Sequence, residues 1–107
     1  MSAAIIEIRR YIAHPGKRAE LVAYMDEVVI PFVRERGVEV SASLVDQADE
    51  DAYIWIRSFE NEADKQSKYE AIYQNPEWIA TISPVVASLM DFDTAVITTA
   101  SPTVAAG

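Results

Sequence analysis

Hydrophobic residues recur along this chain with two different periods, and the change of period marks the expected elements. Over residues 4–12 and 52–59, aliphatic residues alternate with polar or aromatic ones, which predicts two β-strands with chemically different faces. Over 17–36, apolar residues recur every three or four positions, which predicts a helix. Pro31 lies inside this helix and has no backbone N–H, so we expect a kink or a restart near Ile30.

Further strand and helix signals follow in the second half of the chain. A weaker alternation over 38–45 predicts a strand, and an acidic turn at 46–51 joins it to the strand at 52–59. Asn61 and Asn75 are suited to begin two helices, because their side chains accept backbone N–H groups at a helix start. We therefore expect two successive helices after the third strand.

The end of the chain changes in composition. β-branched residues over 91–99 predict a last strand. Ser, Pro, Thr and small residues over 100–107 predict a disordered tail, which leaves 1–99 as one domain. The expected order is β-α-β-β-α-β with an additional helix before the last strand. This order is typical of an α+β ferredoxin-like sandwich, in which helices cover one face of a four-stranded antiparallel sheet.

In this topology the first and third strands are central neighbours. We expect their isoleucine faces to pack against the helices. The opposite face would then carry six polar or aromatic side chains away from the helices: Glu7, Arg9, Tyr11, Tyr53, Trp55 and Arg57. Exposed rings and charges in such number indicate an interface or a ligand groove. We therefore expect a second subunit to cover this face.

Composition excludes several kinds of function. The chain carries 17 acidic and 9 basic residues, and a net charge of −8 would repel a nucleic-acid backbone. It has no cysteine and a single histidine, His14, so we expect no metal site and no thiolate catalysis. Three scattered glycines form no nucleotide-binding motif, so no cofactor is expected. No run approaches the roughly 20 apolar residues of a membrane span, and we expect a cytoplasmic protein without membrane partners.

Three segments carry a resemblance to a known family. They are I-I-E-I-R-R-Y-I-A-H-P-G-K-R over 5–18, W-I-R-S-F over 55–59 and Y-Q-N-P-E-W over 73–78. Together they resemble the NIPSNAP family of the dimeric α/β-barrel superfamily, over about 4–98. The resemblance implies a homodimer whose two sheets face one another to form a barrel, often with a small-molecule cavity in each half.

The wider superfamily does not select one reaction. It includes cofactor-free monooxygenases, haem-degrading monooxygenases, lactone isomerases, polyketide cyclases and stress-response proteins. The haem-degrading relatives use an Asn, a Trp and a His around the haem. Here the one histidine, His14, lies in a predicted loop, so haem degradation is not expected.

Each candidate site residue has two interpretations. Glu7 and Arg9 would serve as a general base and an anion anchor, or as an intersubunit ion pair that sets the register of the dimer. Arg57 would complete either arrangement. Tyr11, Tyr53 and Trp55 would stack on a planar ligand and donate to a developing anion, or would form the core of the interface. Tyr69 and Trp78, at helical spacing from apolar residues, are expected to be core residues without chemistry.

Two function classes therefore stay open. The first is a homodimer that binds a small aromatic or conjugated ligand in a barrel cavity. As an enzyme it would be a cofactor-independent monooxygenase, isomerase or cyclase, with Glu7 moving the proton and Arg9 or Arg57 holding the anion. The second is a non-catalytic dimeric interaction or stress-response protein whose inner face is closed by packing.

Overall fold

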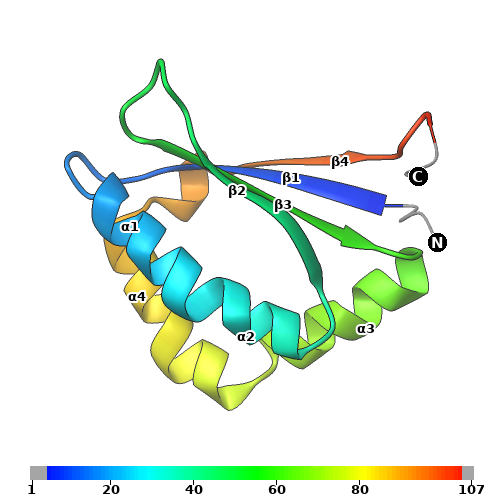
Figure 1. Cartoon of the computed structure of the whole chain (residues 1–107). Helices are drawn as coiled ribbons and strands as arrows, with labels where there is room; N and C mark the ends of the chain where they lie inside the picture. The colour runs from blue at the N-terminus through cyan, green and yellow to red at the C-terminus, as the bar shows by residue number, and fades with distance from the viewer. Residues whose placement is uncertain (1–4, 105–107) are drawn as a thin grey trace.

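A four-stranded antiparallel sheet carries all of the helices on one face (Figure 1) in the computed structural model, which describes residues 5–104. The strands are β1 (Ile5–Ile12), β2 (Glu39–Val45), β3 (Ala52–Phe59) and β4 (Val96–Ala100), in the order β2-β3-β1-β4. The central pair, β1 and β3, is in register from Ile5 opposite Phe59 to Ile12 opposite Ala52. The predicted ferredoxin-like α+β fold, with an additional helix before the last strand, is confirmed.

Two of the helical runs change helix type before a proline. The first comprises α1 (Arg18–Tyr24), the π-helical η1 (Met25–Val29) and α2 (Ile30–Glu35). The second follows α3 (Glu62–Tyr73) and comprises the π-helical η2 (Trp78–Ile82) and α4 (Ser83–Leu89). Each π-helical segment ends two residues before its proline, Pro31 or Pro84. A wider turn there accommodates the missing proline N–H, and the restart expected near Ile30 is seen as this change of helix type.

Both predicted helix caps are present. The Asn61 side chain accepts the backbone N–H of Asp64 at 2.8 Å, and the Asn75 side chain accepts that of Glu77 at 2.9 Å. These bonds satisfy N–H groups that the first turn of a helix leaves without a partner. Asn75 lies between the end of α3 and the start of the next helical run.

The last strand begins later than the sequence predicts. The Asp91 side chain accepts the Asp93 N–H at 2.9 Å and holds a 3-10 turn, η3 (Phe92–Thr94), where a strand was expected. β4 then includes Ala100, which we had assigned to the tail. Residues 101–104 belong to no helix or strand, and 105–107 lie outside the described residues, as does Ala4 at the predicted start of the first strand. The division into a domain and a disordered tail stays a prediction.

The two faces of the sheet are the reverse of the prediction. The six polar and aromatic residues face the helices and are at most 8 % exposed: Glu7, Arg9, Tyr11, Tyr53, Trp55 and Arg57. The isoleucines of β1 and β3 other than Ile5 form the opposite face and are only partly buried. The expected packing is wrong because the helices supply hydroxyl groups that satisfy the buried charges, so the larger side chains fill the core.

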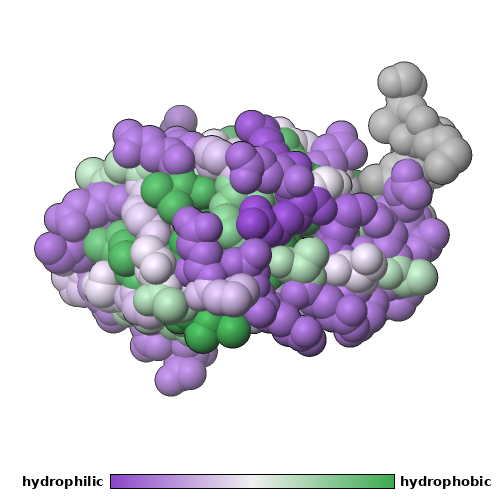
Figure 2. Space-filling view, turned by 90° about the horizontal axis from the view of Figure 1, so that it is seen from below, coloured by the Kyte–Doolittle hydropathy of each residue, from purple (hydrophilic) through white to green (hydrophobic). Residues whose placement is uncertain are grey.

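The surface on the helical side of the molecule differs from the isoleucine face of the sheet. Viewed from that side, hydrophilic residues predominate and surround separate hydrophobic patches (Figure 2). Within residues 5–104, no helix is long and apolar enough to cross a membrane. The buried polar side chains lie in the layer between the helices and the sheet.

Candidate functional site

Glu7 is held between two arginines in the middle of the sheet. One carboxylate oxygen accepts Arg9 Nε at 2.5 Å and Arg57 Nε at 2.6 Å. The other oxygen accepts the Tyr69 hydroxyl, and Lys65 Nζ lies 3.8 Å away. Strand pairing explains the geometry, since the register of β1 and β3 places Glu7 directly opposite Arg57. The ion pairs are complete within one chain, so the predicted intersubunit pairing of these residues is wrong.

The surroundings of Glu7 make its carboxylate a weak base. Burial by itself would raise the Glu7 pKa, but Arg57, Arg9 and the Tyr69 hydroxyl outweigh it and lower the pKa to about 2. Both oxygens are also occupied by hydrogen-bond donors. Glu7 therefore neutralises and orients the arginines, and its ionised form persists through the neutral range.

Arg57 is enclosed by aromatic rings. Its guanidinium carbon lies 5.1 Å from the ring centres of Trp55 and Tyr69 and 5.7 Å from those of Phe59 and Tyr73. Its Nη2 donates to the Tyr73 hydroxyl at 2.8 Å. Aromatic faces attract a cation, so this cage stabilises a guanidinium that has no exposed surface.

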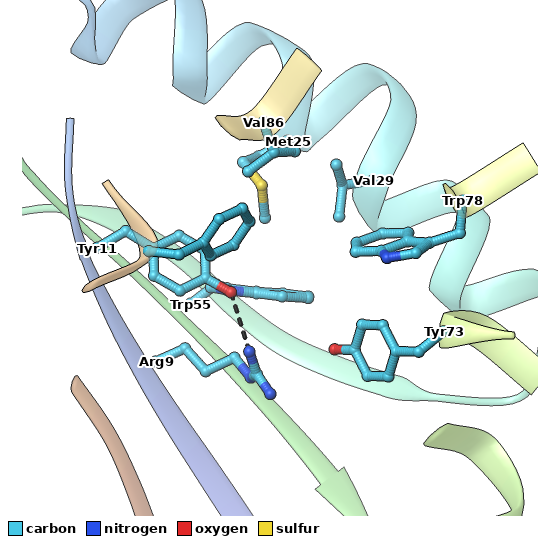
Figure 3. A pocket seen from close by; sticks show the side chains of 9 residues that line it. Arg9, Tyr11, Met25, Val29, Trp55, Tyr73, Trp78 and Val86 are labelled. Atoms are coloured by element: carbon cyan, nitrogen blue, oxygen red, sulfur yellow. Dashed lines mark hydrogen bonds between the residues drawn. The ribbon is translucent and has the colours of Figure 1, made fainter. Parts of the chain in front are cut away.

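Beside this cluster lies a cavity of about 90 Å³ between the sheet and the helices (Figure 3). The sheet contributes Arg9, Tyr11 and Trp55. The helical side contributes Met25 and Val29 from η1, Tyr73 from α3, Trp78 from η2 and Val86 from α4, and Phe92 lies on η3. The cavity thus collects residues from elements far apart in sequence, and both π-helical segments contribute to its wall.

Charge and polarity are concentrated at one end of this cavity. The Arg9 guanidinium and the hydroxyls of Tyr11 and Tyr73 lie on one side, below the apolar group of Met25, Val29 and Val86 (Figure 3). Arg9 Nη1 donates to the Tyr11 hydroxyl at 3.1 Å. Such a division suits a ligand with an apolar body and one polar end.

The predicted site residues fall into two groups. Arg9, Tyr11 and Trp55 line the cavity, whereas Glu7 and Arg57 lie in the ion cluster beside it and do not line it. Tyr53 points elsewhere and contacts the Ser43 hydroxyl at 2.7 Å, and burial raises its pKa to about 12. His14 is exposed. Within residues 5–104, no cluster of three or more His, Asp or Glu side chains is suited to hold a metal ion.

Three aromatic residues of the site were not predicted from the sequence. Tyr69 and Trp78 were expected to have only a core role, and Tyr73 was not singled out. Tyr69 instead donates to Glu7, and Tyr73 and Trp78 line the cavity. The available signal was the spacing of four between Tyr69 and Tyr73, which places both phenols on one face of α3. That face lies above the arginines of the sheet.

Comparisons with known proteins support the fold. No protein-family model matches the sequence, and no curated protein matches it. Among solved structures, an uncharacterized NIPSNAP domain protein from Burkholderia xenovorans has a TM-score of 0.81 at 12 % identity, over 92 % of this chain and 93 % of that one. A NIPSNAP family protein from Agrobacterium tumefaciens has a TM-score of 0.82 at 19 % identity, over 96 % and 89 % of the two chains.

A third neighbour has a reported type of activity. SnoaB from Streptomyces nogalater, a cofactor-independent oxygenase, has a TM-score of 0.68 at 14 % identity, over 95 % of each chain. At these identities the likeness shows the fold alone. The chain has the fold of NIPSNAP family proteins, and the resemblance noted in its motifs is confirmed at that level.

Proposed function

We propose that this chain is a NIPSNAP-like homodimeric protein that binds a small aromatic or conjugated ligand between its sheet and its helices. The observation that carries the proposal is the wall of the cavity, where the rings of Tyr11, Trp55, Tyr73 and Trp78 surround an apolar space with Arg9 at one end. Flat rings favour stacking on a flat ligand, and one charged group orients it.

The size of the cavity limits how such a ligand binds. Its volume of about 90 Å³ is smaller than the roughly 150 Å³ of an apolar protein cavity that accepts benzene. Among the described residues of the wall, Phe92 is the most exposed, at 44 %. It lies on the short turn η3, with its ring centre 6.4 Å from that of Tyr11. We propose that displacement of Phe92 enlarges the cavity and admits the ligand.

The dimer is proposed to form through the open face of the sheet. This face carries partly buried isoleucines, with Leu44 and Val96 at its two edges: Ile6, Ile8, Ile12, Ile54 and Ile56. Leu44 is 47 % exposed and Val96 56 %. Arg10, paired with Asp46, is the charged residue of β1 on this otherwise largely apolar face. Apolar patches of this size are covered in most proteins. A second copy would therefore cover the isoleucines, while each subunit keeps its ion cluster internal.

If the chain is an enzyme, we propose that its chemistry is cofactor-independent. SnoaB shares the fold and is a cofactor-independent oxygenase, which supports a monooxygenase as one of the enzyme classes. An isomerase or a cyclase that needs no cofactor is the other possibility we propose. Arg9, Tyr11 and Tyr73 would stabilise a developing oxyanion at the polar end of the cavity. Glu7 and Arg57 would position Arg9 rather than react, because they do not line the cavity.

The alternative is a non-catalytic dimeric interaction protein. The small volume of the cavity favours this alternative, because the space between sheet and helices is largely filled by side chains. Under this alternative the cavity would hold only water. The same homodimer would form, since its interface lies on the other face of the sheet.

Native mass spectrometry of protein purified gently from its own host tests both proposals. A dimer that carries a reproducible small-molecule mass supports a ligand cavity. An empty dimer in repeated preparations favours the interaction protein. A monomer at micromolar concentration contradicts the proposed dimer.

A further inference from the structure

The polar end of the cavity offers hydrogen-bond donors without matching acceptors. An arginine side chain has five N–H hydrogens and no acceptor atom. Arg9 uses three of them, toward Glu7, Tyr11 and Tyr69. Within residues 5–104 the other two have no acceptor, and Arg9 lines the cavity. A cationic donor with spare N–H groups therefore faces this space.

Both phenol hydroxyls at this end are also donors. The Tyr11 hydroxyl accepts Arg9 Nη1 at 3.1 Å, and the Tyr73 hydroxyl accepts Arg57 Nη2 at 2.8 Å. Because arginine only donates, neither contact uses the hydrogen of the phenol itself. No acceptor for either hydrogen lies among the described residues. Burial raises the Tyr73 pKa, so this hydroxyl keeps its proton.

Trp55 adds an independent observation. Its ring lines the cavity and is 1 % exposed, and its indole N–H has no hydrogen-bond partner within the described part of the chain. A buried donor without a partner is unfavourable. Trp55 therefore joins Arg9, Tyr11 and Tyr73 as a group that a ligand oxygen would satisfy.

The local charge has the same sign as these donors. One carboxylate, Glu7, faces two buried arginines, Arg9 and Arg57, and Lys65 lies near it as well. The cluster thus has an excess of positive charge in a region with little solvent. A buried charge that lacks its counterion is strongly destabilising, so an anion in the cavity would complete the balance.

We infer that the ligand of this cavity is an oxyanion on a flat apolar body, with its oxygens bound by Arg9, Tyr11, Tyr73 and the indole N–H of Trp55. A carboxylate and a phenolate or enolate share this chemistry. The inference rests on the proposed ligand-binding function and adds the charge of the ligand to it. The rings of Trp55 and Trp78 would contact its apolar body.

Intrinsic tryptophan fluorescence measures ligand binding in the cavity, because the chain has two tryptophans and both line it. The protein is titrated at neutral pH with benzoate, pentafluorophenolate, benzyl alcohol and benzylamine. We expect at least one of the two anions to bind about tenfold or more tightly than benzyl alcohol, since hydrogen bonds to charged groups are the stronger ones. Benzylamine should bind most weakly. The tighter of the two anions identifies the carboxylate or the phenolate source.

Two variants test the donors. Tyr73→Phe and Tyr11→Phe keep the rings and remove the hydroxyls, and each should lower the preference for the anion over benzyl alcohol by about fivefold. Tyr24→Phe is the matched control, because Tyr24 lies on α1 and does not line the cavity. It should leave the preference unchanged. Circular dichroism establishes that each variant is folded.

The outcomes separate this inference from the proposed function. If benzyl alcohol or benzylamine binds as tightly as both anions, the cavity binds ligands but the inferred charge is wrong. If the anions bind but both tyrosine variants keep the full preference, the assigned donors are wrong. If none of the four probes binds, the proposed ligand-binding function fails, and the inference fails with it.

Discussion

The two faces of the central strands β1 and β3 differ in a way that hydropathy does not anticipate. One face carries Glu7, Arg9 and Arg57 among aromatic rings and is buried beneath the helices. The other carries five isoleucines and is only partly buried. The charged face is buried because Tyr69 and Tyr73 reach it from α3 and form hydrogen bonds with Glu7 and Arg57.

The two faces also differ in how they are stabilised. The buried ions of the charged face depend on one another, because each is favourable only while its partner ion is present. On the isoleucine face each side chain contributes separately, by about 25 cal/mol per Å² of apolar area that becomes buried. Substitutions on the charged face should therefore affect folding. Substitutions on the isoleucine face should affect association.

The largest effect is expected from Glu7→Gln. It leaves Arg9 and Arg57 buried without their carboxylate, which should lower the free energy of unfolding by about 3–5 kcal/mol, out of the 5–15 kcal/mol typical of a domain. Urea denaturation followed by circular dichroism measures the loss. The exposed Glu70→Gln on α3 is the control and should change stability by under about 0.5 kcal/mol.

A double variant sharpens this result. Glu7→Gln combined with Arg57→Met removes one of the two unpaired cations, so it should lose less stability than the sum of the two single variants. Additive losses would mean that Glu7 and Arg57 do not act as a pair. A loss below about 1 kcal/mol for Glu7→Gln alone would contradict this mutual dependence of the buried ions.

The next effect concerns the isoleucine face. Ile8→Asp places a charge at the centre of the proposed dimer interface, and should weaken dimerisation at least about a hundredfold, or about 3 kcal/mol. The fold should persist, because Ile8 points away from the helices. Sedimentation analysis over a range of concentrations measures association, and Gln66→Asp on the exposed side of α3 is the control. A dimer of Ile8→Asp as strong as the original would place the interface elsewhere.

Acid should destabilise the charged face in a defined range of pH. The Glu7 pKa is lowered from an ordinary value of 4.5 to about 2, so its stabilisation is complete above about pH 4.5 and is lost as the pH falls toward 2. The loss should amount to about 3 kcal/mol in that range. Asp46 also has a lowered pKa, so urea denaturation must be compared between the original protein and Glu7→Gln at each pH. Equal acid sensitivity in both would exclude Glu7 as the titrating group.

The fold was predictable from sequence because its signals are local. Alternation marked β1 and β3, and the caps at Asn61 and Asn75 marked two helix starts. These signals act within a few residues, and tertiary structure did not override them. The start of β4 was misplaced because Asp91 forms a turn with its own backbone neighbours, in competition with the strand.

The site was predictable only in part because it depends on contacts between distant elements. Arg9, Tyr11 and Trp55 were identified from the alternation and do line the cavity. Which face the helices cover depends on Tyr69, which follows Glu7 by 62 positions in the chain. A rule that places aliphatic residues inside cannot detect a partner of that kind.

The smallest effect concerns the route by which a ligand enters the cavity beside the charged face. The isoleucine face has no proposed ligand, so a change that opens the cavity should alter ligand kinetics and leave association and stability almost unchanged. Phe92→Ala removes the most exposed ring of the cavity wall and should lower stability by under about 1 kcal/mol, because Phe92 is 44 % exposed. The association rate of benzoate should rise severalfold in stopped-flow tryptophan fluorescence, since no ring has to move first. Ile79→Ala is the control, because Ile79 is a still more exposed apolar side chain, at 58 %, and does not line the cavity; it should leave that rate unchanged. If Phe92→Ala also leaves it unchanged, ligands reach Arg9 by another route, and the turn at Phe92–Thr94 has only a structural role.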